Sequence, residues 1–200
     1  MNILNLYAGI GGNRKLWSEE HSITAVEFDP KIAEVYQSLY PKDTVVIGDA
    51  HQYLLDHYKE FDFIWSSPPC QTHSVCNHFL NAQGVVRYPD MSLWQEILFL
   101  KTFCKTKFVV ENVKSYYTPL IEPQKCGRHY FWSNFEIPYI NTHTSSIGRF
   151  GPTKKGRTDN KSHHKLGIDL SNYKIANKTK LLNNCVIPEL GLHILKQISK

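Results

Sequence analysis

Short apolar segments recur along the chain, and each ends at a loop rich in glycine, proline or acidic residues. They predict strands over Asn2–Leu6, Ile23–Glu27, Thr44–Ile47, Phe61–Trp65 and Lys107–Val110. Short apolar runs bounded by such loops are typical of strands that are buried on both faces. We therefore expect an α/β fold around an open, doubly wound and mostly parallel sheet. Ligands of such sheets bind beyond the carboxyl ends of the strands.

A glycine-rich loop follows the first predicted strand and consists of Tyr7, Ala8, Gly9, Ile10, Gly11 and Gly12. Glycines allow the backbone to approach a ligand closely and to adopt φ values that other residues rarely take. We expect a helix over Asn13–Glu20, whose N-terminus would face the bound group. A lone glycine loop can also be only a tight turn.

Acidic residues end the next two predicted strands. Glu27 closes the second strand, and Asp49 follows the third after Gly48. The separation of Glu27 from the glycine loop suits the carboxylate that holds ribose hydroxyls in nucleotide-binding α/β units. Together the glycine loop and the two acids predict a crevice that binds adenosine.

Cys70 lies in the run Ser66-Ser67-Pro68-Pro69-Cys70-Gln71, directly after an apolar strand. The two prolines cannot continue a strand ladder, so the chain must leave the sheet in a stiff loop. A thiol held at this edge is a candidate nucleophile. The alternative is a packing role, because free cysteine is among the residue types most often buried.

The segment after Cys70 allows two interpretations. Cys70, His73, Cys76 and His78 are zinc-type ligands, and His163 and His164 add two more, so a zinc-containing nucleic-acid-binding protein is one alternative. The spacing lacks the usual second pair of ligands. We expect instead that Thr72–Asp90 is a mobile catalytic loop containing Gly84, followed by a helix over Met91–Cys104.

The two halves of the chain carry opposite charge. Residues 1–100 have 6 Lys or Arg against 12 acids, whereas residues 101–200 have 17 against 6. Within residues 141–180 there are 9 basic residues and 2 acids. A basic surface of this kind favours contact with nucleic-acid phosphates over a merely solvated loop. The residues expected to make such contacts are Arg149, Lys154, Lys155, Arg157, Lys161 and Lys165.

Composition indicates one ordinary globular unit. Two hundred residues with 42% hydrophobic content can bury a core. We expect no membrane span and no signal peptide, with the mature chain starting at Met1. Five cysteines form no paired framework, which suits a reducing cytoplasm, in a bacterial or phage-infected cell or associated with the nucleoid.

The motifs together resemble those of the DNA (cytosine-5)-methyltransferases. The matching strings are NLYAGIGG, VEFDP, GDA, SSPPCQ, ENV, GRHYFW and NNCVIPELGLHIL, and they occur in the family's order. They cover about residues 1–140 and 180–200. The resemblance implies a Rossmann-like methyltransferase fold, with S-adenosyl-L-methionine as methyl donor and C5 of cytosine as acceptor.

The resemblance implies a covalent mechanism. Cytosine C5 becomes nucleophilic enough only after something adds at C6, and the Cys70 thiolate would make this attack. Glu111 would hydrogen-bond N3 of the ring, for which it must be protonated. Asn112 would brace the nucleophile loop, with Gln71 and Arg128 completing the catalytic set.

The resemblance also implies a cofactor set. Tyr7 and the backbone of Ala8 to Gly12 would flank the methionine and ribose parts of the donor. Glu27 would bind the ribose hydroxyls, and Asp49 would accept from the adenine amine. Phe28 could stack on the purine or be an aromatic residue of the core. The remaining expected cofactor residues are Ala50, Pro69, Asn184 and Val186. The helix Pro188–Ile198 is expected to pack back against the first strand.

The sequence departs from the family in two places. Asn5 replaces the aspartate that usually begins the glycine loop, which removes a charge pairing with the donor's ammonium group. The family tends to have two arginines, one residue apart, where this chain has only Arg128; His129 or Lys125 could partly replace the other.

We predict a catalytic and cofactor-binding domain, residues 1–140 with 181–200, and a small basic, loop-rich recognition lobe, residues 141–180. Duplex substrate requires the cytosine to be flipped out of the stack. So small a lobe suggests help from a homodimer or a partner protein, or a single-stranded substrate. Alternatives are a transfer RNA cytosine C5 methyltransferase and a catalytically silent nucleic-acid-binding protein. The target sequence and a role in restriction, phage modification or regulation are not predicted.

Overall fold

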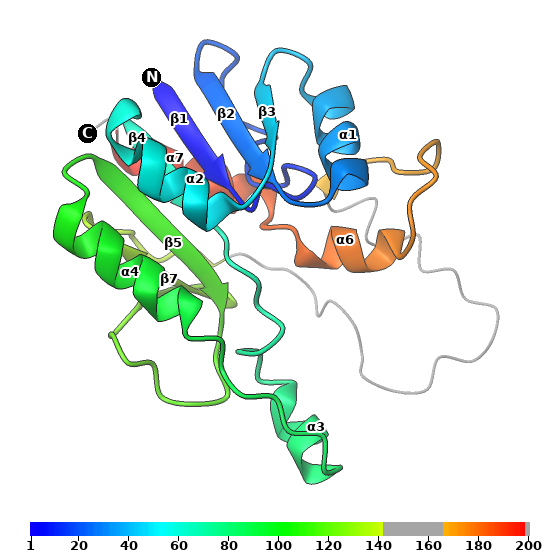
Figure 1. Ribbon diagram of the computed structural model, residues 1–200, viewed down its shortest axis with the longest axis vertical. Helices are drawn as coiled ribbons and strands as arrows, with labels where there is room; N and C mark the ends of the chain where they lie inside the picture. Colours follow the sequence, from blue (N-terminus) through cyan, green and yellow to red (C-terminus); the bar gives the residue numbers. More distant parts are fainter. Residues whose placement is uncertain (142–165, 199–200) are drawn as a thin grey trace.

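The computed structural model describes residues 1–141 and 166–198, and in these ranges the chain forms an α/β fold (Figure 1). The strands are β1 (Asn2–Leu6), β2 (Ser22–Glu27), β3 (Thr44–Ile47), β4 (Phe63–Ser66), β5 (Lys107–Val113), β6 (Gln124–Cys126) and β7 (His129–Ser133). The helices are α1 (Pro30–Leu39), α2 (Ala50–His57), the 3-10 turn η1 (Tyr58–Glu60), α3 (Asn77–Ala82), α4 (Ser92–Phe103), α6 (Lys178–Asn184) and α7 (Pro188–Ile198).

The strands make one seven-stranded sheet in the order β3-β2-β1-β4-β5-β7-β6. β1 to β5 run parallel, and β7 pairs antiparallel with β5 and with β6. The chain winds outward from β1 to β3 and then returns to β4 on the other side of β1. This reversal places a topological switch point, the usual ligand position in open α/β sheets, between β1 and β4.

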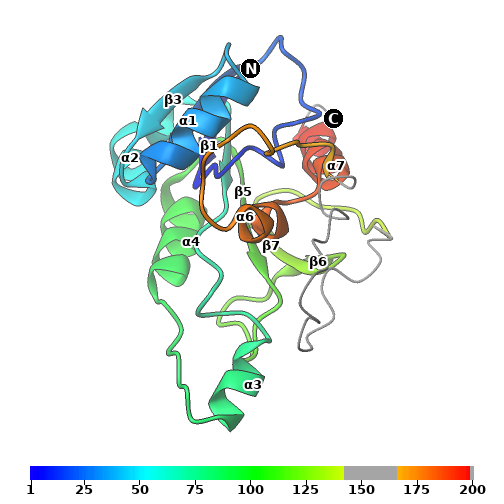
Figure 2. The same cartoon turned by 90° about the vertical axis from the view of Figure 1, so that its right-hand side faces the viewer.

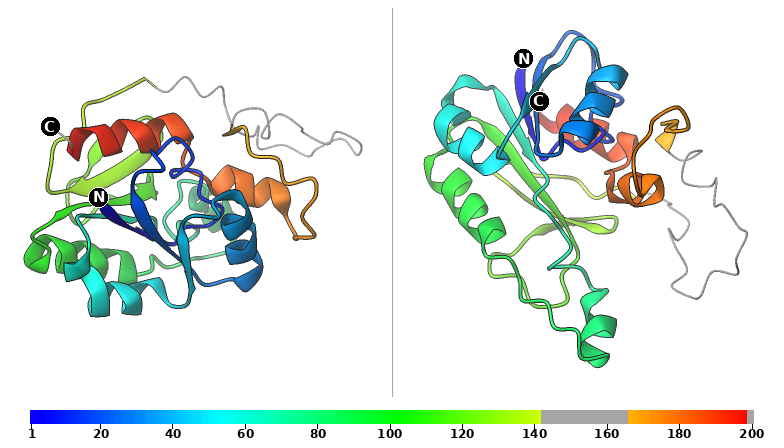
Figure 3. Two further views of the ribbon diagram at one scale, coloured as in Figure 1. Left: turned by 90° about the horizontal axis from the view of Figure 1, so that it is seen from above. Right: turned by 45° about the vertical axis from the view of Figure 1, so that its right-hand side comes forward.

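Two apolar layers cover the sheet, as expected for strands that are buried on both faces. On one face, α2 and α4 pack on alternate residues of β1 and β4, including Leu4, Leu6 and Ile64. On the other face, α7 and Trp17 pack on Ile3 and Phe63. Figure 3 shows α7 opposite α2 and α4 across the sheet. The doubly wound sheet is therefore confirmed.

Most of the predicted elements are confirmed. β1 and β3 have the predicted bounds, β4 starts two residues later than predicted, and α4 lies within its predicted range. β5 extends beyond its prediction to Val113, so Glu111 and Asn112 are inside the strand. α7 begins and ends where predicted, and its Leu190 and Ile194 share the apolar cluster of Ile3. The β6–β7 hairpin had no counterpart in the prediction.

The predicted helix over Asn13–Glu20 is wrong. The chain makes successive turns there, with i→i+3 hydrogen bonds such as Trp17 N to Arg14 O at 2.9 Å. Helical backbone is replaced because the side chains of Asn13 and Arg14 turn inward to bond Asn5 and Asp43. The helix whose N-terminus was expected to face the bound group is therefore absent from residues 13–20.

The predicted catalytic loop Thr72–Asp90 contains a short helix, α3, which lies far from the sheet at the end of an extended arm (Figure 2). Exposed apolar side chains cover this arm, among them Phe79 and Tyr88. Its motion stays a prediction. No helix in the described part of the chain is long and apolar enough to span a membrane.

Residues 166–180, assigned by the sequence to the recognition lobe, pack on the sheet domain. Leu166, Ile168 and Leu170 share a buried cluster with Ile10 of the glycine loop and Val35 of α1. The Lys15 ammonium donates to the carbonyl of Leu166 at 2.6 Å and to that of Gly167. Residues 166–170 therefore lie beside the glycine loop.

Candidate active site

A cleft of about 1020 Å³ opens at the carboxyl ends of β1, β2, β4 and β5. It is at the upper end of the range that binds drug-sized ligands. Every predicted cofactor and catalytic residue lines it, except Gly11 and Asn112. The structure therefore brings the two predicted sets into one continuous space.

The cofactor end of the cleft is organised by Glu27. Its carboxylate accepts from the backbone N–H of Gly9 at 2.8 Å and of Asp29 at 2.9 Å. Gly9 needs its positive φ of 56°, and a Cβ added there would meet no atom within 4 Å, so the loop backbone faces open space. Glu27 thus holds the glycine loop and still has lone pairs for a ligand.

Asp49 and Phe28 complete this end. Asp49 is the N-cap of α2, and its Oδ1 accepts from the N–H groups of His51 and Gln52. Its Oδ2 can therefore accept from a ligand. Phe28 is 77% exposed, which for a large aromatic ring at the mouth of a cleft marks a surface available for stacking.

A buried acid beneath the cleft was missed by the sequence analysis. Glu96 of α4 is 1% exposed and accepts from the Tyr7 hydroxyl at 2.9 Å and from the Ser66 hydroxyl. It also contacts His51 Nδ1 at 3.1 Å, a bond that raises the pKa of His51. Burial, and then the charge of Glu96, raise the pKa of Tyr7. One carboxylate thus fixes the ends of β1 and β4 and the start of α2.

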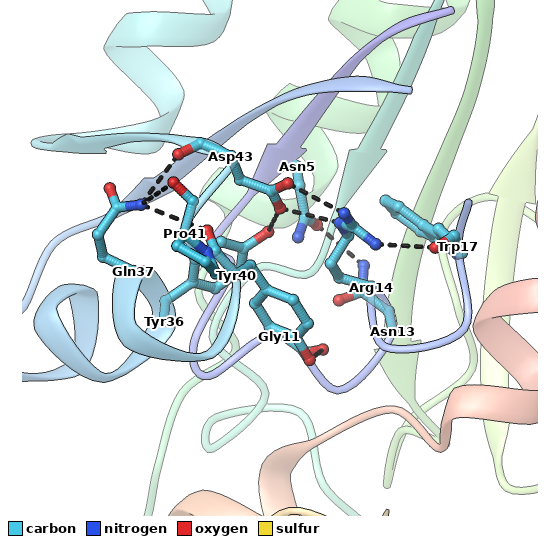
Figure 4. Close-up of polar contacts among 10 residues, drawn as sticks. All are labelled: Asn5, Gly11, Asn13, Arg14, Trp17, Tyr36, Gln37, Tyr40, Pro41 and Asp43. Carbon is cyan, nitrogen blue, oxygen red and sulfur yellow. Dashed lines mark hydrogen bonds and ion pairs between the residues drawn. The ribbon is translucent and has the colours of Figure 1, made fainter. Parts of the chain in front are cut away.

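A second polar cluster supports the glycine loop from behind (Figure 4). Arg14 forms a bidentate pair with Asp43, with Nε–Oδ2 at 2.8 Å and Nη2–Oδ1 at 3.0 Å, and both side chains are almost fully buried. Tyr36 donates to Asp43 at 2.9 Å, and Tyr40 donates to the carbonyl of Gly11 at 2.7 Å. A Cβ on Gly11 would collide with both tyrosine rings, so only glycine fits there.

Asn5, the departure from the family, takes part in this support. It is 1% exposed, and its Oδ1 accepts from Asn13 Nδ2 at 2.9 Å. The Asn13 amide satisfies the Asn5 oxygen, whereas the buried Asn5 Nδ2 has no hydrogen-bond partner among the described residues. Asn5 therefore holds the turn that follows the glycine loop.

The nucleophile loop is braced from β5. Asn112 donates from Nδ2 to the carbonyl of Pro68 at 3.1 Å, the kind of contact that its predicted bracing role requires. Beyond Cys70, Ser74 forms a β-bridge with Ser115, and Tyr116 N–H donates to the carbonyl of His73 at 3.0 Å. The loop is thus held at both sides of the thiol.

The zinc alternative has no geometric support in residues 1–141 and 166–198, where no three His, Cys, Asp or Glu side chains gather to hold an ion. His73 is buried and bonds the Tyr117 hydroxyl through Nδ1 at 2.6 Å. Burial lowers the pKa of His73, which is thus a neutral imidazole holding the loop. His163 and His164 lie outside the described residues.

Cys70 is half-buried in the cleft, and this controls its ionisation. Burial, and then the negative charge of Glu111, raise the pKa of Cys70 to about 11. Lys180 of α6 acts in the opposite direction. At neutral pH the resting protein therefore holds a thiol, and only a small fraction is the nucleophilic thiolate.

Alkylation of Cys70 should reflect this ionisation. Between pH 7 and pH 10 the rate should rise about tenfold per pH unit, because the thiolate fraction grows tenfold per unit below the pKa. Glu111→Gln removes the repelling charge and should make Cys70 react faster at pH 8. The measurement is peptide mapping by mass spectrometry after timed iodoacetamide treatment. An unchanged rate in Glu111→Gln would contradict the proposed effect of that charge.

Glu111 contacts His129, which the sequence analysis gave only as a partial replacement for the missing second arginine. His129 Nδ1 lies 2.5 Å from Glu111 Oε1, and both side chains line the cleft. Arg128 also lines the cleft and is exposed, whereas Lys125 pairs with Glu122 at 3.8 Å beside a different cavity. Of the two predicted substitutes, His129 is the one beside the acid.

The predicted phosphate-contacting residues lie outside the described residues. They are Arg149, Lys154, Lys155, Arg157, Lys161 and Lys165. Their role stays a prediction from charge.

Comparison with known proteins gives both structural likenesses and a family. No curated protein matches the chain. Among solved structures, a Spodoptera frugiperda DNMT2 variant is 26% identical over 56% of this chain and 35% of its own, with a TM-score of 0.42. An Escherichia coli prophage protein described as a putative DNA modification methyltransferase is 19% identical over 59% and 33%, with a TM-score of 0.41. An Agrobacterium tumefaciens SAM-dependent methyltransferase is 14% identical over 59% and 40%, with a TM-score of 0.42. The chain thus spans a third to two fifths of these three proteins.

The family model described as C-5 cytosine-specific DNA methylase matches residues 1–120, which carry the glycine loop, the nucleophile loop and β5. This match covers more than half of the chain and both ends of the cleft. The chain therefore belongs to the C-5 cytosine-specific DNA methylase family.

Proposed function

We propose that the protein methylates C5 of cytosine in DNA through a covalent adduct between Cys70 and C6. The observation that carries this proposal is the shared cleft, in which Cys70 and Glu111 face the same space as Glu27, Asp49 and the glycine loop. A thiol and an acid beside an adenosine-type site are the groups that this chemistry requires.

S-adenosyl-L-methionine, the family's methyl donor, supplies an activated methyl group when bound. The residues fit it. The Glu27 carboxylate can accept from the ribose hydroxyls, and Asp49 Oδ2 from the adenine amine. Phe28 offers an exposed ring for the purine, and the open face of Gly9 leaves room for the backbone of the glycine loop to approach the donor.

The chain's own groups then act on cytosine. The Cys70 thiol releases its proton to water and the thiolate adds to C6, and the electron pair displaced from the C5–C6 bond is shared by C5 and N3. Glu111 hydrogen-bonds N3 and stabilises this charge. After C5 has been methylated, water takes its proton and Cys70 departs as the thiolate, which restores the ring. Asn112 keeps the loop in place through Pro68.

The last part of the proposed function is recognition of the target DNA. The forty residues of the predicted lobe have too few large apolar side chains to build a core of their own. We propose that a second copy or a partner protein supplies target recognition for duplex DNA, with the basic lobe contacting phosphates.

The proposed function is tested by offering labelled S-adenosyl-L-methionine with unmethylated duplex DNA, single-stranded DNA and transfer RNA in parallel. Label in 5-methylcytosine from either DNA supports the proposal. Label on transfer RNA alone would replace DNA with RNA as the substrate. No label, with normal donor binding, would contradict the proposal for the isolated protein.

Glu27→Ala should weaken binding of S-adenosyl-L-methionine by about tenfold to a hundredfold, because it removes the carboxylate for the ribose hydroxyls and the bond to Gly9 N–H. Calorimetric titration measures the dissociation constant. The matched control is Glu34→Ala on the exposed side of α1, which makes the same charge change away from the cleft. Equal affinities in the two variants would remove Glu27 from the ribose role.

A further inference from the structure

A second cavity, of about 410 Å³, has no place in the proposed reaction. Its volume is within the range of pockets that bind small ligands. Its wall contains the rings of Tyr116, Tyr117 and Tyr130, together with the amine of Lys125. Proteins that bind single-stranded nucleic acid stack successive bases on aromatic rings in a positively charged groove. The cavity therefore has the composition of a nucleobase site.

The cavity adjoins the cleft at the end of β5. Lys114 lines the cleft, and the next residue, Ser115, lines the cavity. Because consecutive Cα atoms are about 3.8 Å apart, the two walls meet at this point of the chain. The Lys114 side chain is exposed there. A cation at the junction can contact the phosphate that joins a nucleotide in the cleft to its neighbour.

The β6–β7 hairpin supplies one wall of the cavity. Tyr130 of β7 is in register with Asn112 of β5 and with Lys125 of β6, so the three side chains lie on one face of the sheet. The Tyr130 ring is partly exposed and packs against Trp132, with the ring centroids 6.2 Å apart. The sheet therefore holds this ring in place before a ligand binds, which lowers the entropic cost of stacking.

The segment after β5 supplies another wall and connects it to the predicted catalytic loop, Thr72–Asp90. The Tyr117 hydroxyl bonds His73 Nδ1 at 2.6 Å, and the Tyr116 hydroxyl donates to the carbonyl of Arg87 at 3.0 Å. The two tyrosine rings meet edge to face, with centroids 5.1 Å apart. Two rings of the cavity thus hold the loop that follows the nucleophile.

The charges around the cavity favour a strand of nucleic acid as its ligand. Lys125 lines the cavity, Lys114 and Arg128 line the cleft, and all three are exposed. Glu122 offsets one of these charges, at 3.8 Å from the Lys125 amine. The remaining positive charge attracts phosphate. A nucleotide presents both a ring for the tyrosines and a phosphate for the cations.

We propose that this cavity binds the base of the nucleotide next to the target cytosine in the DNA strand. The inference rests on the proposed function and adds a second base site to it. With cytosine in the cleft and its neighbour in the cavity, two adjacent bases leave the duplex stack, each at a cost in unstacking energy. The site therefore favours DNA that is single-stranded or locally opened.

The test measures binding of fluorescent single-stranded DNA by anisotropy, without a methyl donor. One oligonucleotide has its only cytosine between ordinary nucleotides of mixed sequence. The matched oligonucleotide has an abasic site on each side of that cytosine and keeps every phosphate. The wild type should bind the first about fivefold to a hundredfold more tightly, because one base–aromatic stack contributes about this much.

Variants of Tyr130 assign the preference to the cavity. Tyr130→Leu keeps an apolar side chain but removes the ring, and it should bring the two affinities within about twofold of each other. Tyr130→Phe keeps the ring and should preserve the preference. Tyr139→Leu is the matched control, because Tyr139 is 65% exposed and lines neither the cleft nor the cavity. Thermal unfolding checks that each variant folds.

A second measurement uses the wild-type protein. An oligonucleotide with 5-iodouracil next to its cytosine is irradiated in the complex, and the cross-linked peptide is identified by mass spectrometry. The expected peptide contains Tyr116, Tyr117 or Tyr130.

Equal affinities of the wild type for the two oligonucleotides, or a cross-link confined to other peptides, would overturn the inference. A preference that is unchanged in Tyr130→Leu would overturn it as well. Methylation of cytosine without a preference for neighbouring bases removes only this site and leaves the proposed function. A preference of the wild type that Tyr130→Leu abolishes, without methylation of any DNA, contradicts the proposed function and supports the nucleobase site.

Discussion

Cys70→Ala is expected to lower methyl transfer by at least about a thousandfold, because loss of a covalent nucleophile removes the whole route and not one contact among several. Affinity for S-adenosyl-L-methionine should stay within about twofold of the wild type. Glu27, Asp49 and the glycine loop keep their own hydrogen bonds without the thiol. Initial rates with saturating donor, together with calorimetric binding, measure the two quantities.

The matched control is Cys76→Ala, which makes the same chemical change in the same loop. Cys76 also lines the cleft but has no place in the proposed reaction. Its rate should stay within about threefold of the wild type. Residual turnover in Cys70→Ala comparable to that of Cys76→Ala would eliminate the covalent mechanism.

Arg14→Ala is expected to destabilise the protein by about 3–5 kcal/mol, because removing one member of a buried ion pair leaves the other charge buried and unpaired. Asp43 is 5% exposed, and among the described residues its carboxylate would keep only the Tyr36 hydroxyl as a side-chain partner. The carbonyl of Trp17 would also lose its bond from Arg14. Urea unfolding followed by circular dichroism measures the change in the free energy of unfolding.

Lys42→Ala provides the control, because Lys42 pairs with Glu19 on the surface, where both side chains are more than 70% exposed. Exposed pairs contribute little to stability, so the unfolding midpoint should change little. Similar destabilisation by the two substitutions would show that burial of the Arg14–Asp43 pair is not what matters.

The sheet could be predicted from sequence because each strand is a short apolar run with a loop residue after it. Leu4 and Ile3 face opposite layers, and a strand that is buried on both faces needs apolar side chains at every position. The candidate site followed from the same rule. Parallel strands place their carboxyl ends at one edge, so Gly9, Glu27, Asp49 and Cys70 had to converge.

The features that the sequence analysis predicted wrongly or missed depend on contacts between residues far apart in the sequence. Asn13–Glu20 has a helix-compatible composition, but tertiary bonds from Asn13 and Arg14 override local propensity. Glu96 is an acid on a buried apolar helix face, a signal visible in the sequence, but its partners are Tyr7 directly after β1, Ser66 of β4 and His51 of α2. The contact of His129 with Glu111 requires the β5–β7 pairing, which the sequence analysis had not predicted.

The most direct test of the central claim is to trap the adduct with duplex or single-stranded DNA that carries 5-fluorocytosine, in the presence of S-adenosyl-L-methionine. Release of Cys70 requires that the hydrogen on C5 leaves as a proton. Fluorine takes the place of this hydrogen and cannot leave as a cation, so the bond between Cys70 and C6 should persist. We predict a protein–DNA complex that survives denaturation, whose only modified peptide contains Cys70, and no such complex with Cys70→Ala. Methylation of normal cytosine without a trapped complex, or a complex attached at another residue, would contradict the proposed mechanism.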